Sequence, residues 1–131
     1  MKRLPTESHL DKVVEILSRS PLFEGLSEAS VRKLAQYVAV VQWEPGEVIL
    51  KEGDVADTFL VLLGGNAAVE VAQKPGVPPV QVARLQGGDL VGEMALLLEQ
   101  PRTASVVAES AVVAVEFRSA VFLKLFQQIP S

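Results

Sequence analysis

GEMALLLEQPRTASV, residues 92 to 106, places Glu93 and Arg102 nine positions apart among residues that are mostly apolar or small. An arginine keeps its charge in a protein, and a buried charge is costly unless an anion meets it. Gly92 allows the backbone to come close to a ligand, and the N–H groups of a helix that follows it would point toward the same place. The segment therefore predicts an anion site in which Arg102 contributes most of the binding.

Glu93 cannot hold a phosphate, but its carboxylate can accept a hydrogen bond from a sugar hydroxyl. One cation and one acceptor in an apolar pocket suit a ribose phosphate. The alternative is that Glu93 and Arg102 pair with each other, or that Arg102 pairs with Glu99, on a solvated edge.

Composition restricts the class of protein. A chain of 131 residues, 49% of them hydrophobic, predicts one domain with a proper core. The net charge of −4 and the scattered Lys and Arg residues argue against nucleic acid as a partner. The absence of cysteine excludes disulfides and thiolate chemistry, and a single histidine, His9, leaves little for imidazole chemistry or a metal site. We therefore expect no enzyme activity and no cofactor.

The apolar runs are too short to span a bilayer, and the first residues lack the apolar core of a signal peptide. We expect a cytoplasmic protein without direct membrane insertion.

Helical periodicity occurs at both ends of the chain. Leu10, Val13, Val14 and Leu17 form one apolar stripe, which predicts a short helix that ends at Ser20. A second helix is expected from a Ser27 cap to about residue 37. Further helices are predicted at 93–98 and from Ser119 onward, the latter carrying Val121, Phe122, Leu125 and Phe126.

Between these helices, short runs rich in Val, Ile, Leu and Phe alternate with Gly, Pro and Asp turns, as is typical of a β-sandwich or barrel. This pattern predicts a mainly β fold, an antiparallel jelly roll with flanking helices. The expected strands are 38–43, 47–51, 58–63, 67–73, 80–85, 104–109 and 111–117, with a short eighth strand near Leu90.

The segment 92–106 also resembles the phosphate-binding cassette of the cyclic nucleotide-binding domain family. The matching residues are Gly92, Glu93, Met94, Ala95, Leu96, Pro101, Arg102, Thr103, Ala104, Ser105 and Val106. The similarity extends to PLFEGLS at 21–27, to the turns at 45–47 and 52–54, to Gly65 and to Gly88-Asp89. It therefore covers most of the chain.

The resemblance implies roles for individual residues. Arg102 would hold the cyclic phosphate of cAMP or cGMP, and Glu93 would accept from the ribose 2′-hydroxyl. The backbone near Gly92, Met94, Ala95 and Thr103 would complete the cradle, with Ala104 beside it. Val91, Val82 and Met94 are candidates for the apolar wall.

The Thr103 hydroxyl could bond the phosphate of either nucleotide, or the amino group of a syn guanine. We expect cAMP to be preferred over cGMP.

The resemblance also divides the single domain of residues 1–131 into parts. Residues 1–37 are an N-terminal helical segment, 38–118 the β-barrel with its cassette at 92–106, and 119–131 a C-terminal helix, with the family's further lid helix expected to be absent. The expected function is that of a regulatory sensor, with an effector domain or a second subunit as a partner. The alternative is a ligand-free jelly roll that serves protein interaction or oligomerisation.

Overall fold

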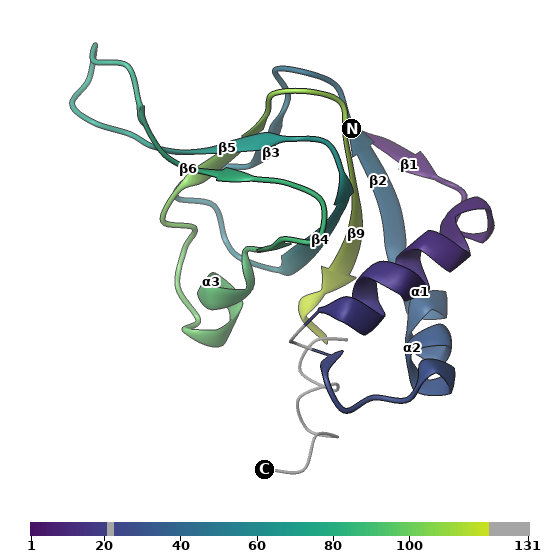
Figure 1. The fold of residues 1–131 in the computed structure, drawn as a ribbon. Coiled ribbons are helices and arrows are strands. Elements are labelled where there is room, and N and C mark those ends of the chain that lie inside the picture. Colours follow the sequence, from purple (N-terminus) through teal and green to yellow (C-terminus); the bar gives the residue numbers. More distant parts are fainter. Residues whose placement is uncertain (21–22, 121–131) are drawn as a thin grey trace.

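The structure is a computed structural model that describes residues 1–20 and 23–120. Two antiparallel sheets face each other, and helices cover one of them (Figure 1). The first sheet has the order β1-β2-β9-β4-β7, with strands Lys2–Leu4, Ala39–Trp43, Val112–Arg118, Thr58–Gly64 and Leu90–Val91. The second has the order β3-β8-β5-β6, with strands Val48–Leu50, Ser105–Ala108, Ala67–Val71 and Val80–Leu85. The mainly β jelly-roll fold is confirmed.

The described helices begin and end close to the predicted positions, except for the short helix at Glu7–His9, which was not predicted. They are η1 (Glu7–His9), α1 (Leu10–Arg19), α2 (Glu28–Leu34), η3 (Ala35–Tyr37) and α3 (Glu93–Leu97). Ser27 caps α2 as expected, since its hydroxyl accepts from the Ser30 N–H at 3.1 Å. The helix predicted from Ser119 lies, beyond Ala120, outside the described residues.

The first sheet separates two cores because its central strands are buried on both faces. On β9, Val115 and Phe117 face the helices, whereas Val112 and Ala114 face the second sheet. The neighbouring strands β4 and β2 alternate in the same way. The helix-side core is centred on Phe117, which stacks on Phe59 with ring centroids 4.5 Å apart and on Phe23 at 5.5 Å.

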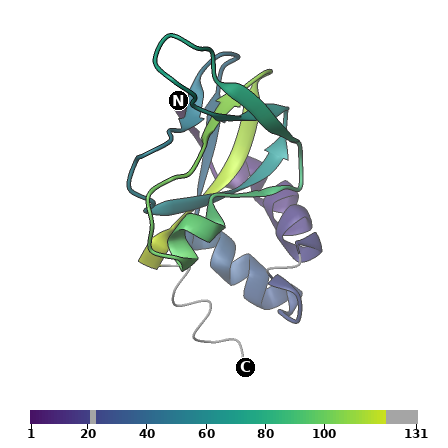
Figure 2. The ribbon, with the colours of Figure 1, turned by 90° about the vertical axis from the view of Figure 1, so that its left-hand side faces the viewer.

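The cassette lies where the two sheets meet. Strand β7 pairs with β4 and leads through Gly92 into α3, after which the chain returns along β8 in the second sheet. Figure 1 shows α3 on the side of the barrel away from the α1–α2 pair, and in Figure 2 α3 faces the viewer. The connection between β5 and β6 projects away from the barrel (Figure 1).

The prediction missed one strand. Residues Lys2–Leu4 form β1, which pairs antiparallel with β2 in the register Lys2↔Gln42 to Leu4↔Val40. A segment of three residues, two of them cationic, is too short to show the periodicity of a strand. Its strand conformation therefore depends on pairing with the edge of β2 rather than on its own sequence.

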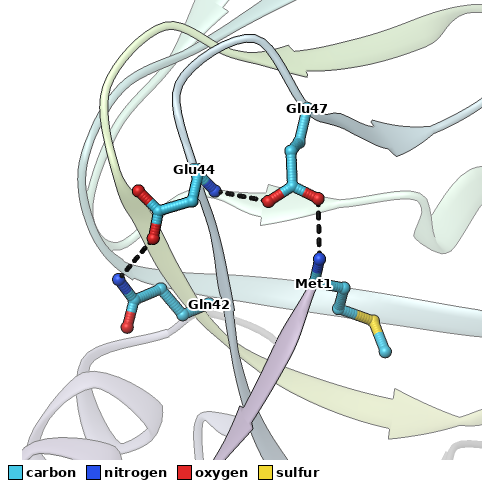
Figure 3. A network of polar contacts seen from close by, with 4 residues as sticks. All are labelled: Met1, Gln42, Glu44 and Glu47. Atoms are coloured by element: carbon cyan, nitrogen blue, oxygen red, sulfur yellow. Dashed lines mark hydrogen bonds and ion pairs between the residues drawn. The ribbon is translucent and has the colours of Figure 1, made fainter.

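A polar network fixes the beginning of β1 (Figure 3). The Met1 ammonium donates to one carboxylate oxygen of Glu47 at 2.6 Å, and the Glu44 N–H donates to the other at 2.8 Å. The Gln42 amide donates in turn to Glu44 at 3.4 Å. The hydrogen bond from the Met1 ammonium is the largest cause of a lowered Glu47 pKa, followed by the Glu44 backbone bond.

A pH titration checks this network. The carboxylate form of Glu47 is the one that is stabilised, so its contribution is present above the unfolded pKa and is lost as pH falls through the lowered folded pKa. We expect the Glu47 side-chain carbon signal in NMR to titrate below the ordinary value of 4.5. Acetylation of the Met1 amine should raise that midpoint, and an unchanged midpoint would contradict the assigned cause.

Candidate functional site

Arg102 is held at both its backbone and its side chain. The Gly53 N–H donates to the Arg102 carbonyl at 2.8 Å, and the Arg102 N–H donates to the Asp54 carbonyl at 2.9 Å. The turn between β3 and β4 therefore sets the position from which the side chain extends inward.

The guanidinium group is buried and bonded only to backbone carbonyls in the described part of the chain. It donates through one terminal nitrogen to the Gly92 carbonyl at 2.6 Å and through the other to the Thr58 carbonyl, and only 6% of the residue is exposed. None of the ion pairs among residues 1–20 and 23–120 includes Arg102. Because a guanidinium has five N–H donors, this arrangement leaves donors and a positive charge for an external anion.

The electrostatics of Arg102 agree with this geometry. Burial lowers its pKa from the ordinary value, while the negative charges of Asp57 and Glu93 raise it in part. An arginine with a lowered pKa still carries its proton at neutral pH. The site therefore holds a desolvated cation on which the charges of Asp57 and Glu93 act without forming an ion pair with it.

Gly92 is required by both its backbone angle and its neighbours. Its φ is +86°, and it begins α3. A Cβ atom on Gly92 would lie 2.5 Å from a terminal nitrogen of Arg102 and 3.2 Å from the guanidinium carbon. The absence of a side chain thus makes room for the Arg102 head group.

Gly92→Ala should weaken anion binding and stability together. Positive φ costs an L-residue about 1–2 kcal/mol. Displacing the guanidinium removes at least one charge-assisted bond of about 1.5–3 kcal/mol, or roughly ten- to a hundredfold in affinity. Chemical denaturation and titration with a cyclic nucleotide measure the two effects. Gly25→Ala is the control, because Gly25 also has positive φ but open space around it; equal affinity losses in both variants would contradict the assignment.

A cavity of about 240 Å³ opens beside Arg102. Its lining is mostly aliphatic and includes two charged residues, Arg102 and Glu93, the latter at the start of α3. The lining residues are Leu50, Val69, Leu85, Leu90, Val91, Gly92, Glu93, Met94, Ala95, Arg102, Thr103, Ala104 and Val106. An apolar pocket with few polar groups is the usual form of a small-molecule site.

Arg102 also lines a larger hollow of about 800 Å³. Three carboxylates line it, those of Asp54, Asp57 and Glu116, together with the cations Lys51, Arg102 and Arg118. The formal charges balance in both cavities, so net charge does not distinguish them. The smaller cavity is the better candidate because its lining is mostly apolar and Arg102 is its one cation among the described residues.

The smaller cavity brings together most of the residues singled out from the sequence. Val91 is buried in its wall, whereas Met94 and Thr103 are exposed at its margin. Val82 is the exception: it does not line the cavity and is 57% exposed. The pairing of β5 with β6 steps from Val69↔Ala83 to Glu70↔Gln81, so Val82 is the extra residue of a β-bulge and has no cross-strand partner.

Other contributors had not been anticipated. The Thr58 carbonyl and the charge of Asp57 act on Arg102 from the start of β4, and Leu50, Val69 and Leu85 form part of the wall. The inward positions of β5 and β6 could have been inferred from strand alternation, but a backbone carbonyl has no sequence signal.

In 1–20 and 23–120, no three His, Asp or Glu side chains come together in a way that could hold a metal ion. No helix in the same ranges has the length and apolar character needed to cross a membrane.

The fold and site define a jelly-roll domain with an arginine-lined cavity, and comparison with known proteins identifies its family. Residues 40–129 match the sequence model of the cyclic nucleotide-binding domain. The chain therefore belongs to the cyclic nucleotide-binding domain family.

Individual relatives agree with this assignment. A cGMP-dependent protein kinase of Eimeria tenella is 35% identical over 101 residues, which are 77% of this chain and 10% of that protein. The regulatory domain of Toxoplasma gondii PKA, solved with cAMP, has a TM-score of 0.81 at 26% identity, covering 92% of this chain and 46% of that one. A cyclic nucleotide-binding domain from Methylobacillus flagellatus has a TM-score of 0.82 at 25% identity, covering 98% and 72%. The chain spans about a tenth of the length of the kinase relative.

Proposed function

We propose that this domain binds a cyclic nucleotide in the cavity beside Arg102 and acts as a regulatory sensor. The observation that carries the proposal is that Arg102 is buried, that its guanidinium bonds to backbone carbonyls alone among the described residues, and that it lines an apolar cavity. A cyclic phosphate carries one negative charge and several acceptor oxygens, which match the unused donors of Arg102.

In this proposal, the Glu93 carboxylate accepts a hydrogen bond from the ribose 2′-hydroxyl. In support, Glu93 is the first residue of α3, lines the cavity, and takes part in none of the ion pairs among the described residues. Backbone groups of Gly92, Met94, Ala95 and Thr103 would complete the cradle, while Val91 supplies apolar contact. Binding of this kind needs no further cofactor and no metal.

Cyclic AMP is the proposed ligand. Solved relatives at 26% and 27% identity are described with cAMP bound, those of the Toxoplasma and PfPKA-R regulatory proteins. The second candidate is cGMP, which two observations favour: the relative from Eimeria tenella is a cGMP-dependent kinase, and the exposed Thr103 hydroxyl lies at the cavity margin, where a guanine amino group could reach it.

The proposed mechanism is a population shift. A ligand that binds more tightly to one arrangement of α3 stabilises that arrangement, and the chain beyond Ser119 would carry the change to an effector domain or a second subunit. Because the matched relative is a kinase of which this chain covers a tenth, a kinase is one such effector for the whole protein. The domain itself is proposed to have no catalytic activity.

Calorimetric titration of the wild-type protein with cAMP and with cGMP tests the proposal. We expect saturable binding with a Kd on the order of micromolar or tighter, which corresponds to about −8 kcal/mol, and tighter binding of cAMP. Glu93→Ala removes the acceptor and should lower the affinity for cAMP more than that for 2′-deoxy-cAMP, since only the former has the hydroxyl. No heat with either nucleotide would favour the ligand-free interaction module instead.

A further inference from the structure

The turn at residues 51–54 forms hydrogen bonds to the cassette at Ser105 as well as at the Arg102 backbone. Besides the two bonds to Arg102, the Glu52 N–H donates to the Ser105 hydroxyl at 2.9 Å. Three hydrogen bonds therefore fasten a four-residue turn to the part of the cassette that runs from the arginine into β8.

The Glu52 side chain continues this set of contacts to the opposite strand. Its carboxylate accepts from the Ala72 N–H at 2.8 Å. Ala72 follows directly after β5, the strand whose Val69 lines the cavity. Through one half-buried residue, the segment that carries Arg102 is thus connected to the end of a strand in the cavity wall.

The sheet alone does not make this connection. The pairing of β5 with β8 ends at Glu70↔Ser105, two residues before Ala72. Beyond that pair, the hydrogen bond from the Ala72 N–H to Glu52 connects the end of β5 to the cassette side. Glu52 therefore links β5 and β8 at the end of the sheet nearest to Arg102, where their own pairing has ended.

We propose that Glu52 is a positioning residue for the ligand site: it fixes the Arg102 segment relative to the β5 wall without touching the ligand. The inference rests on the proposed cyclic-nucleotide binding. It predicts that loss of the Glu52 acceptor weakens binding of an anionic nucleotide, because the guanidinium and the wall are no longer held at one spacing.

Simple electrostatics predicts the opposite. Glu52 is a negative charge on the same side of the domain as an anion site, so its removal by itself should leave binding of an anion unchanged or slightly tighter. A loss of affinity in Glu52→Ala therefore has to come from the lost hydrogen bond. Glu52→Gln separates the two effects, since its amide oxygen can still accept from Ala72 while the charge is gone.

The test is a titration of the wild-type, Glu52→Ala and Glu52→Gln proteins with cAMP, cGMP and adenosine. Glu24→Ala is the charge control, because Glu24 is exposed and far along the chain from the cassette. We expect a three- to tenfold loss of cyclic-nucleotide affinity in Glu52→Ala and near wild-type affinity in Glu52→Gln and Glu24→Ala. The affinity for adenosine, which lacks the phosphate, should fall less in Glu52→Ala than the affinity for the cyclic nucleotides.

Two further measurements keep the result interpretable. Exchange of the Ala72 amide hydrogen should be faster in Glu52→Ala than in the wild type and Glu52→Gln. Ser105→Ala removes the neighbouring bond to the Glu52 N–H, and its effect on affinity should be less than additive with that of Glu52→Ala.

The outcomes separate the two proposals. If the wild-type protein binds neither cyclic nucleotide, the proposed function fails. If the wild type binds and Glu52→Ala binds equally well, or Glu52→Gln loses as much affinity as Glu52→Ala, the positioning role is overturned while the proposed function stands.

Discussion

Arg102→Ala should weaken cyclic-nucleotide binding by about a hundredfold to ten-thousandfold. Two charge-assisted hydrogen bonds of about 1.5–3 kcal/mol each disappear, and each 1.4 kcal/mol is a factor of ten in affinity. The loss should appear equally for cAMP and cGMP, since the phosphate is common to both. Isothermal titration with each nucleotide provides the measurement.

The fold should tolerate this change. The substitution leaves the Gly92 and Thr58 carbonyls without their donor, but it also removes a desolvated charge, and these two effects oppose each other. We expect a change in the free energy of unfolding within about 1–2 kcal/mol. Arg118→Ala is the matched control: Arg118 is exposed on the larger hollow, so its removal should leave the affinity close to that of the wild type. Equal affinity in Arg102→Ala and the wild type would contradict the assignment of the site.

Gly65→Ala should destabilise the domain more than any other substitution considered for this chain. Gly65 has a φ of +90° between β4 and β5, and a Cβ there would lie 2.1 Å from the Ala111 carbonyl oxygen and 2.9 Å from the Val112 Cα. Both atoms belong to the backbone at the start of β9, so no side-chain rotation can relieve the conflict. We expect a loss of about 3–5 kcal/mol, a large part of the 5–15 kcal/mol typical of a domain.

Gly46→Ala separates the conformational cost from the steric one. Gly46 has a φ of +89° but no neighbour within 4 Å of its would-be Cβ, so only the strain of about 1–2 kcal/mol should remain. Urea denaturation of both variants, followed by circular dichroism, compares them. If Gly65→Ala and Gly46→Ala lose the same stability, the close approach of Gly65 to β9 is not what requires glycine.

The strands could be predicted because their apolar pattern and their turns agree. β6 was predicted at its observed bounds, and β9 shows why alternation is informative even in a strand buried on both faces: Val115 and Phe117 share one core, Val112 and Ala114 the other. The apolar pattern of the sequence does not reveal which strands pair or in what register. Neither β1, which depends on the exposed edge of β2, nor the bulge that excludes Val82 from the cavity leaves a periodic signal.

The candidate site was predictable as far as side chains encode it. Gly92, Glu93 and Arg102 could be named because their residue types are unusual in an apolar stretch, and the structure places all three at one cavity. The contacts that fix the arginine come from the Thr58 carbonyl and from the backbone of residues 53–54, which no residue type specifies. Long-range backbone contacts of this kind appear only once the chain is folded.

A crystal structure of the domain with cAMP is the most direct test of the central claim, that the cavity beside Arg102 is a cyclic-phosphate site. We expect the phosphate within about 3 Å of the Arg102 guanidinium, the ribose hydroxyl at Glu93, and the base outside the phosphate cradle. A nucleotide bound in the larger hollow near Asp54 and Glu116, or in the cavity with its phosphate away from Arg102, would contradict it.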